Sequence, residues 1–356
     1  MSTLFDTLKI GEIELKNRIV MAPLTRSRAN DEGVQPDFTV DYYTQRASGG
    51  LLITEATNVS PMAKGYVRTP GIYTAEQIES WRKVTDSVHA NGGKIFMQIF
   101  HTGRIALPDF LPDRQLPVAP SAVKAAGENY TDEGMKEFVI PREMTTDEVR
   151  STVQDYATAA KNAIEAGFDG VEIHGANGYL IQQFLSTNVN LRTDEFGGSI
   201  ENRSRFLLEI VEAVTSAIGS ERTGLRLSPG GEFNDIKETD AEKLYDYVIG
   251  KLNGFGLAYL HIGTFDQHRD WHPVLRPLYN GIYFAGVGFD KARAERVLAE
   301  GGADAIVFGK LFLANPDLPE RFRTDAELNA WDESTFYTPG EKGYTDYPKL
   351  ARSAQA

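Results

Sequence analysis

The chain has 356 residues, of which 41% are hydrophobic and 24% are charged, a composition typical of globular proteins with one large core or two modest ones. The absence of cysteine excludes disulfides, thiolate metal sites and a cysteine nucleophile. The formal charge of −13, without any run of Lys and Arg that would build a basic patch, argues against nucleic acid as a partner.

No stretch of about 18 consecutive apolar residues occurs in the sequence. The opening residues, MSTLFDTLKIGEIELKNR, include acidic side chains and no apolar segment of signal-peptide length. We therefore expect no association with a membrane and a cytoplasmic location.

Short apolar runs rich in β-formers alternate with amphipathic helical patterns, which predicts βαβ units around a parallel sheet. There are eight such runs: RIVMAPLT from Arg18, LLITEAT from Leu51, KIFMQIF from Lys94, GVEIHGA from Gly170, GLRLSP from Gly224, AYLHIG from Ala258, IYFAG from Ile282 and AIVFGK from Ala305. The clearest helical patterns are AEQIESWRKVTDSVHANGG and TTDEVRSTVQDYATAAKNAIEAG.

Eight βα units fit an open doubly wound sheet or a closed barrel, and we favour a (β/α)₈ TIM barrel because eight regular repeats within about 250 residues are more typical of it. The remaining residues predict an N-terminal hairpin at LKIGEIEL, a long loop after the third strand, from His101 to about Met144, and a C-terminal tail. We expect residues 1–356 to form a single domain.

Active sites of such barrels lie at the carboxyl ends of the strands, and the loops after strands seven and eight often bind phosphate. Ala285-Gly286-Val287-Gly288 and Phe308-Gly309-Lys310 suit that role, with backbone N–H groups and one cation. The alternative is that these glycines only form tight turns.

Arg226 lies in an apolar run and is expected to point into the barrel, where a cation needs an anion. The anion is either a carboxylate in a buried salt bridge or a cofactor that becomes negative during turnover. Gln98 has two similar interpretations, since its amide suits the edge of a heterocycle or a hydrogen bond within the core.

His174 and Asn177 follow the fourth strand three residues apart and would share one face if a helical turn begins there. Two donors that grip one oxygen would polarise a carbonyl or nitro group, as an oxyanion hole does. Tyr179 is a candidate proton donor, although an ideal helix would turn it away from His174. The spacing alone leaves open whether the three side chains converge.

Several longer segments together resemble the Old Yellow Enzyme family of ene-reductases over nearly the whole chain. They are MAPLTRSRA, YYTQRASGGLLITEAT, AGFDGVEIHGANGYLIQQFLSTNVNLRTDEFGGSIENRSRFLLEIV, GLRLSP, VFGKLFLANPDLPERF and GYTDYP. The resemblance implies non-covalently bound FMN at the mouth of the barrel. The implied flavin-binding residues are Pro23, Leu24, Thr25, Ala56, Gln98 and Arg226, with Gly286, Val287, Gly309 and Lys310 at the phosphate.

The resemblance also implies a ping-pong cycle, in which NADPH or NADH reduces the flavin and an activated alkene then receives the hydride. His174 and Asn177 would bind the substrate oxygen, and Tyr179 would protonate the α-carbon. Expected substrates are α,β-unsaturated ketones and aldehydes, maleimides and nitroalkenes, with nitrate esters and nitroaromatics as further acceptors. Tyr66, Phe100 and Tyr337 match positions that line the pocket, although the two tyrosines would also suit plain packing.

Three features depart from the family pattern. Phe100 stands where many relatives carry Trp, and Lys310 stands where Arg is frequent, which keeps the charge but loses the bidentate fork. The segment FDQHRDWHPVLRPLYNG after the sixth strand is short, so that Arg269, Trp271 and His272 would form an unusual pocket wall.

Two rival functions share parts of this pattern. A barrel aldolase would need a Schiff-base lysine, for which Lys310 is the sole candidate at a strand end. A flavin store or sensor would not need the catalytic set. The six histidines form no cluster with ligand spacing, so no metal is expected. The chain would be a monomer or a homodimer.

Overall fold

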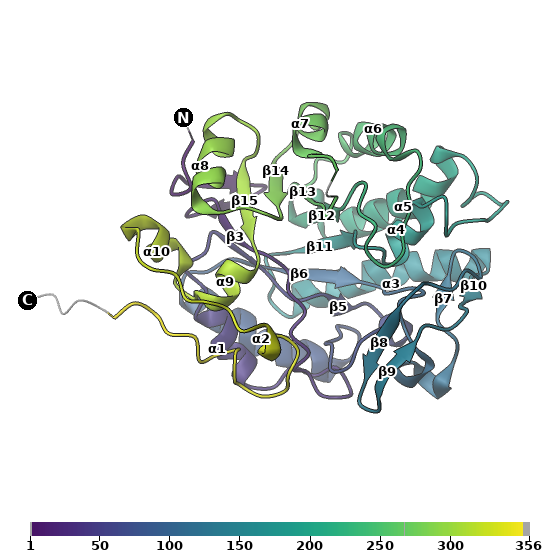
Figure 1. Ribbon diagram of the computed structural model, residues 1–356, viewed down its shortest axis with the longest axis horizontal. Coiled ribbons are helices and arrows are strands. Elements are labelled where there is room, and N and C mark those ends of the chain that lie inside the picture. Colours follow the sequence, from purple (N-terminus) through teal and green to yellow (C-terminus); the bar gives the residue numbers. More distant parts are fainter. Residues whose placement is uncertain (1, 267, 352–356) are drawn as a thin grey trace, which may run out of the picture.

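Eight parallel strands close into a barrel in the computed structural model, which describes residues 2–266 and 268–351 (Figure 1). The strand order is β3, β4, β6, β11, β12, β13, β14 and β15, and β15 pairs with β3 to complete the ring. The pairing of β6 with β11 links the two halves. The predicted (β/α)₈ barrel is therefore confirmed.

Each barrel strand begins within one residue of the start predicted from its apolar run. The strands are β3 (Ile19–Met21), β4 (Leu51–Ile53), β6 (Ile95–Phe100), β11 (Gly170–Gly175), β12 (Thr223–Leu227), β13 (Tyr259–Gly263), β14 (Tyr283–Gly286) and β15 (Ala305–Phe308). A short ninth strand, β5 (Thr57–Asn58), continues from β4 and also pairs with β6. The runs are recognisable because parallel barrel strands are buried on both faces and read as continuous apolar segments.

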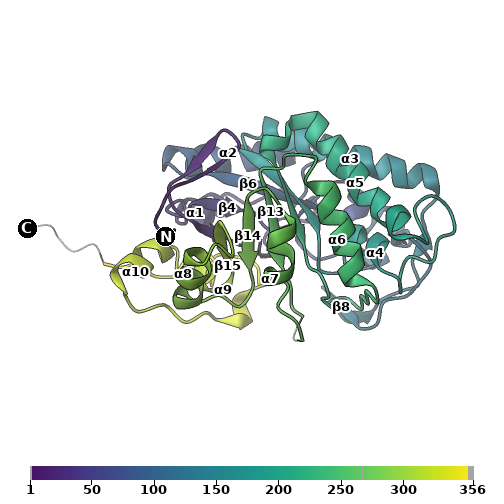
Figure 2. The same ribbon diagram turned by 90° about the horizontal axis from the view of Figure 1, so that it is seen from above.

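Helices surround the strands (Figure 2). They are α1 (Phe38–Thr44), α2 (Ala75–Ala90), α3 (Thr146–Glu165), α4 (Leu180–Leu185), α5 (Ile200–Ile218), α6 (Ala241–Leu252), α7 (His272–Leu275), α8 (Lys291–Ala299), α9 (Lys310–Ala314) and α10 (Leu318–Thr324). Thr74 and Thr145 begin α2 and α3 with complete capping boxes. Within the described residues, no helix is both long and apolar enough to cross a membrane.

The N-terminal half of the barrel interior is filled by aromatic rings. Tyr259 and Phe284 stack with centroids 4.2 Å apart, and Phe96 lies 5.7 Å from Tyr259. Gly170 and Gly224 leave room for these rings, since a Cβ on either would come within 2.5 Å of Phe96 or Tyr259. This end of the barrel is therefore solid, and any ligand has to approach from the other end.

The predicted N-terminal hairpin is confirmed as β1 (Leu8–Ile10) paired antiparallel with β2 (Ile13–Leu15). Its buried residues Leu8, Ile10 and Leu15 belong to the same apolar cluster as the aromatic rings. The hairpin thus covers the solid end of the barrel.

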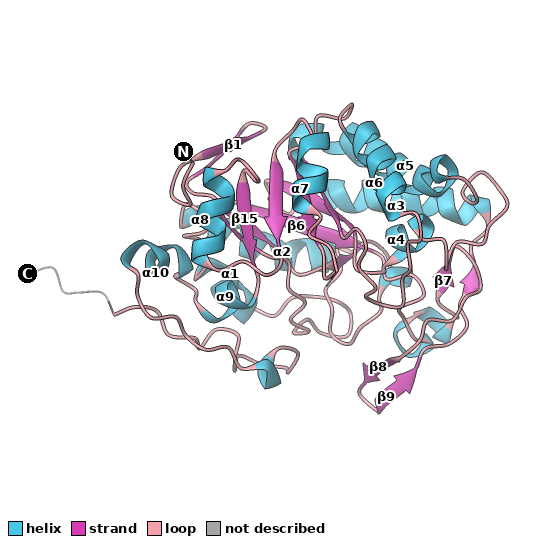
Figure 3. Cartoon of the chain, turned by 45° about the horizontal axis from the view of Figure 1, so that its top comes forward, coloured by secondary structure: helices cyan, strands magenta, loops and turns pink. Residues whose placement is uncertain are grey.

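The long loop after β6 contains two small sheets. Strands β7 (Val118–Ala119) and β10 (Arg142–Glu143) pair in parallel, and β8 (Glu128–Thr131) and β9 (Gly134–Glu137) form a hairpin that lies away from the barrel strands (Figure 3). Short 3₁₀ turns complete the fold: η1 (Pro61–Ala63), η2 (Pro108–Phe110), η3 (Pro112–Arg114), η4 (Ser220–Arg222), η5 (Arg276–Leu278) and η6 (Glu333–Thr335).

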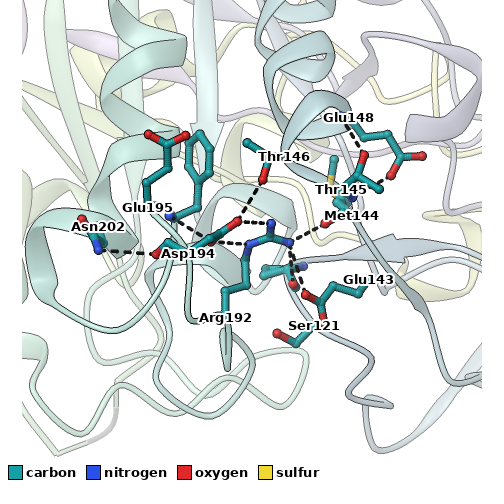
Figure 4. A network of polar contacts seen from close by, with 12 residues as sticks. Ser121, Glu143, Met144, Thr145, Thr146, Glu148, Arg192, Asp194, Glu195 and Asn202 are labelled. Carbon is teal, nitrogen blue, oxygen red and sulfur yellow. Dashed lines mark hydrogen bonds and ion pairs between the residues drawn. The ribbon is translucent and has the colours of Figure 1, made fainter.

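Arg192 attaches this long loop to the segment that follows α4 (Figure 4). Its Nη1 donates to the carbonyl oxygens of Pro120 (3.1 Å) and Met144 (2.5 Å), while Nε donates to Asp194 Oδ1 (3.0 Å). Thr146 in α3 donates to the other oxygen of Asp194 (3.1 Å). The buried guanidinium therefore fixes the middle and the C-terminal end of the loop.

Candidate active site

Inward-facing polar side chains occupy the carboxyl end of the barrel on four adjacent strands. Gln98 lies on β6, Glu172 and His174 on β11, Arg226 on β12 and His261 on β13. The strand register places Gln98 opposite Glu172, and Arg226 opposite both His174 and His261. All five are at most 8% exposed, so the site lies in a poorly solvated environment.

Arg226 is a buried cation without a bound anion. Its side chain forms no ion pair within 4 Å among the described residues, and its Nε has no hydrogen-bond partner there. Burial lowers the pKa of Arg226, and the nearby Glu172 partly opposes that shift. The structural salt bridge considered from the sequence is therefore not formed, and the guanidinium remains free to pair with an anionic ligand.

Gln98 is held by the barrel on one side only. Its Nε2 donates to Glu172 Oε1 over 2.7 Å, and its backbone N–H donates to Thr54. The carbonyl Oε1 of its amide forms no hydrogen bond with the described residues. Ala56 is buried beside β5, which pairs with the end of β6. One polar edge of Gln98 is thus available to a ligand.

The loop that carries Pro23, Leu24 and Thr25 follows β3. The next residue, Arg26, donates its backbone N–H to the buried Glu55 (3.1 Å), and its Nη2 donates to the carbonyl oxygen of Gly343 (2.7 Å). The loop is therefore fixed between the end of β4 and the C-terminal segment.

The rings of His174 and Tyr179 meet, but not through the helical turn that the spacing left open. His174 ends in strand β11, Asn177 has a positive φ of 56°, and Tyr179 is the N-cap of α4. This reversal of the backbone brings the Tyr179 ring to 5.2 Å from the imidazole. His174 Nδ1 and Asn177 Oδ1 are buried and have no hydrogen-bond partner in the described chain. The spacing left open whether His174 and Tyr179 meet, and the backbone answers it with a left-handed residue at Asn177 in place of a helical turn.

A network behind Asn177 fixes this turn. The backbone N–H of Asn177 donates to Ser228 Oγ (2.8 Å), and Ser228 donates to Gln182 (3.0 Å). Gln182 and Tyr245 both donate to Glu238. Burial raises the pKa of the Glu238 carboxyl to about 7. None of these four residues was singled out from the sequence, because they lie on separate elements.

The electrostatics favour uncharged His174 and Tyr179. Burial, with Arg226 nearby, lowers the pKa of His174 well below its usual range, so the imidazole is neutral. Burial likewise raises the pKa of Tyr179. The Tyr179 hydroxyl lies 2.9 Å from that of Tyr66, and Phe100 packs against the Tyr179 ring with centroids 5.4 Å apart. Tyr179 therefore keeps its proton.

A cavity of about 590 Å³ lies beside Tyr66 and Tyr179. Its wall includes Thr25, Tyr66, Tyr179 and Tyr337, which were predicted from the sequence, and Phe233, which was not. Asn129 and Tyr130 of β8 also line it, so the long loop contributes to the site. Tyr337 is 61% exposed and lies at the edge of the cavity.

The glycine loops after β14 and β15 have the backbone geometry expected of tight turns. Val287 and Gly288 both have positive φ values, 71° and 75°, and Gly309 precedes α9. Lys310 Nζ forms an ion pair with Glu333 Oε1 (2.5 Å), and its side chain is half exposed. This position does not fit a Schiff-base lysine, which needs a buried site inside the barrel.

A second cavity, of about 480 Å³, adjoins the loop from Gly286 to Gly288. Arg293 lines it and donates to the carbonyl oxygen of Gly288 (3.0 Å). This cation was not predicted from the sequence. Arg269 and His272 line it as well, whereas Trp271 is buried and donates to Asp266. No group of three or more metal-ligating side chains occurs among the residues described.

The comparisons with known proteins agree with this geometry. Residues 3–329 match the model of the NADH:flavin oxidoreductase / NADH oxidase family. The chain is 46% identical to 12-oxophytodienoate reductase 1 of Oryza sativa subsp. japonica, over 98% of this chain and 93% of that protein. It is also 46% identical to a probable flavin mononucleotide-dependent alkene reductase of Leishmania infantum, over 98% of each chain.

Solved structures give the same result. Morphinone reductase in complex with tetrahydroNAD superposes with a TM-score of 0.96, 46% identity and full coverage of both chains. The Old Yellow Enzyme homologue from Zymomonas mobilis has a TM-score of 0.95 and 40% identity, over 98% of this chain and 99% of that chain.

These matches define a class, the flavin-dependent oxidoreductases built on a (β/α)₈ barrel. Within that class, the chain belongs to the Old Yellow Enzyme family, whose members use FMN and a nicotinamide reductant.

Proposed function

We propose that the protein reduces activated C=C bonds of α,β-unsaturated ketones, aldehydes, maleimides and nitroalkenes, at the expense of NADPH or NADH. The observation that carries this proposal is that the rings of His174 and Tyr179 lie 5.2 Å apart in the turn that contains Asn177, with the buried His174 Nδ1 without a partner in the described chain. Such a set suits a substrate whose oxygen gains negative charge during the reaction.

The unpartnered Arg226 supports the fit of FMN, because reduction places negative charge on the pyrimidine side of the flavin. In this proposal Arg226 and Gln98 hold that side of the ring. Further contacts to the ring come from Pro23, Leu24, Thr25 and Ala56, and the phosphate is bound by Gly286, Val287, Gly309 and Lys310. FMN held by these residues would supply the hydride transfer between the nicotinamide and the β-carbon of the alkene.

The protein side chains activate and protonate the alkene. His174 and Asn177 bind the substrate oxygen, and a neutral imidazole donates one hydrogen bond there without losing a proton. Tyr179 Oη transfers its proton to the α-carbon, and the hydrogen bond with Tyr66 orients the hydroxyl. Because the nicotinamide and the alkene would use the same cavity in turn, the proposed kinetics are ping-pong.

Aromatic walls favour flat substrates. Tyr66 and Tyr337 line the cavity of about 590 Å³, which accommodates a small cyclic or aromatic molecule, and Phe100 packs behind the Tyr179 ring. We therefore include nitrate esters and nitroaromatics as further acceptors, since their oxygens suit the same pair of donors.

An anaerobic absorbance experiment tests the proposal. We expect purified protein to be yellow, to lose its flavin absorbance with NADPH or NADH, and to regain it when 2-cyclohexenone is added. If oxygen reoxidises the flavin but neither the enone nor any other activated alkene does so, alkene reduction is contradicted. A colourless protein that FMN does not reconstitute would contradict the flavin site itself.

A further inference from the structure

Glu172 is a buried carboxyl group that the function above does not use. It lies on β11 two residues before His174, so the two side chains share the inner face of the strand. Its exposure is 0%. A carboxylate inside a barrel is costly unless its oxygens are paired, so its partners indicate what it does.

Both carboxylate oxygens have a specific partner. Oε1 accepts a hydrogen bond from Gln98 Nε2 over 2.7 Å. Oε2 lies 3.0 Å from His261 Nδ1, and because a carboxylate only accepts, this imidazole nitrogen must carry the hydrogen. Glu172 therefore bridges β6 and β13 from its place on β11.

The first contact fixes the orientation of the Gln98 amide. An amide offers an NH₂ group on one side and a carbonyl oxygen on the other. Since Glu172 accepts only, it binds the NH₂ group and leaves Oε1 on the opposite side, where no described residue bonds to it. The acceptor edge of Gln98 is thus left free to bind the ligand.

The Glu172 carboxylate also changes the electrostatics around Arg226. Arg226 pairs in register with His174, one layer above Glu172 in the barrel. Glu172 acts on groups of β12 and β13: it raises the pKa of Arg226 and that of His261, against the lowering that burial causes in each. A fixed negative charge therefore lies beneath the cation that would face the flavin.

We propose that Glu172 is a positioning residue of the flavin site, which holds the Gln98 carbonyl toward the pyrimidine edge of FMN and offsets the field of Arg226. This inference rests on the flavin site proposed above. Because reduction adds negative charge to the flavin, the Glu172 carboxylate makes reduction harder and keeps the midpoint potential lower than Arg226 alone would set it.

Glu172→Gln tests both parts, since it keeps the shape, removes the charge and lets the Gln98 amide turn over. Apoprotein is titrated with FMN by fluorescence, and the midpoint potential is measured by anaerobic titration against a reference dye. We expect the Kd for FMN to rise about tenfold, the loss of one charge-assisted contact, and the potential to become more positive. Glu212→Gln on the exposed face of α5 is the matched control for the loss of one charge and should change neither value.

A double-mutant cycle shows whether Glu172 acts on FMN affinity through Gln98. If Glu172 acts through Gln98, then adding Glu172→Gln to Gln98→Ala should weaken FMN binding little further. Additive losses would overturn the positioning role. Unchanged affinity and potential in Glu172→Gln, with FMN bound normally by the wild type, would overturn the inference alone. Failure of the wild type to bind FMN would overturn the flavin site as well.

Glu172→Asp keeps the test decisive if the first variant does not fold. Aspartate retains the charge but is one methylene shorter, so it cannot reach Gln98 and His261 together. We expect weaker FMN binding with a nearly unchanged potential. An affinity equal to that of the wild type would contradict the proposal.

Discussion

The hydroxyl oxygens of Tyr66 and Tyr179 lie 2.9 Å apart, although the two residues are 113 positions apart in the chain. Tyr66 follows β5, whereas Tyr179 caps α4. Their rings meet edge to face, with centroids 6.2 Å apart. The pair therefore orients the one hydroxyl that we propose as the proton donor.

Tyr179→Phe should slow alkene reduction by about 10²–10³-fold while leaving flavin reduction by NADPH nearly unchanged, since only the alkene step needs the proton. Stopped-flow measurement of the two half-reactions separates these effects. Tyr66→Phe is the matched control: it keeps the donor and removes its partner, so a smaller loss is expected. Equal slowing of both half-reactions in Tyr179→Phe would exclude its role as donor.

His174→Ala combined with Asn177→Ala should weaken the binding of a phenol to the oxidised protein by about 10–100-fold, because two hydrogen bonds to one oxygen are lost. Titration of the flavin absorbance with p-hydroxybenzaldehyde measures the affinity. The FMN content should stay at the wild-type value. An unchanged phenol affinity would remove both residues from the oxygen-binding role.

Glu333→Gln should tighten FMN binding several-fold, because it releases Lys310 from its ion pair and removes an anion near the proposed phosphate site. Lys310→Ala should weaken binding by about tenfold, and Lys310→Arg should not. Fluorescence titrations at low and high salt measure these changes. If neither Glu333→Gln nor Lys310→Ala alters the Kd, Lys310 does not bind the phosphate.

Glu238 should make the folded state less stable as the pH rises. Its pKa is raised to about 7 in the folded protein, above its ordinary value of about 4.3. The stabilisation is therefore complete below about pH 4 and is lost as the pH rises through 7. We expect a loss on the order of 1 kcal/mol, reduced by partial solvent screening. Urea unfolding at pH 5.5 and 8.5 measures it, and the same loss in Glu238→Gln would rule out this carboxyl as the source.

Arg192→Ala should lower the free energy of unfolding by roughly 1–3 kcal/mol, because two carbonyl groups lose their donor and Asp194 loses its charged partner. Arg150→Ala is the matched control, since its ion pair with Glu195 is exposed and should contribute less than about 1 kcal/mol. Similar urea midpoints for the two variants would show that the long loop is held by other contacts.

Much of the architecture was predictable from the sequence, because it follows from local patterns. The eight strands read as apolar runs that are buried on both faces, and Thr74 and Thr145 mark helix starts through their capping boxes. The same reading placed Gln98, His174 and Arg226 at the carboxyl ends of strands. The alternation of side chains along the strands VEIHG and YLHIG also indicates that Glu172 and His261 face inward.

Only the tertiary structure decided how these side chains meet. The left-handed turn at Asn177, the contact between Tyr66 and Tyr179, and the pairing of Lys310 with Glu333 all join residues whose relation is absent from the local pattern. The physical reason is that local propensity and periodicity act over a few residues, whereas an ion pair or a hydrogen bond depends on the distance between strands and loops far apart in the chain. The sequence thus determined the barrel and its polar end, and the fold decided which of those polar groups are paired and which, like Arg226, remain free for a ligand.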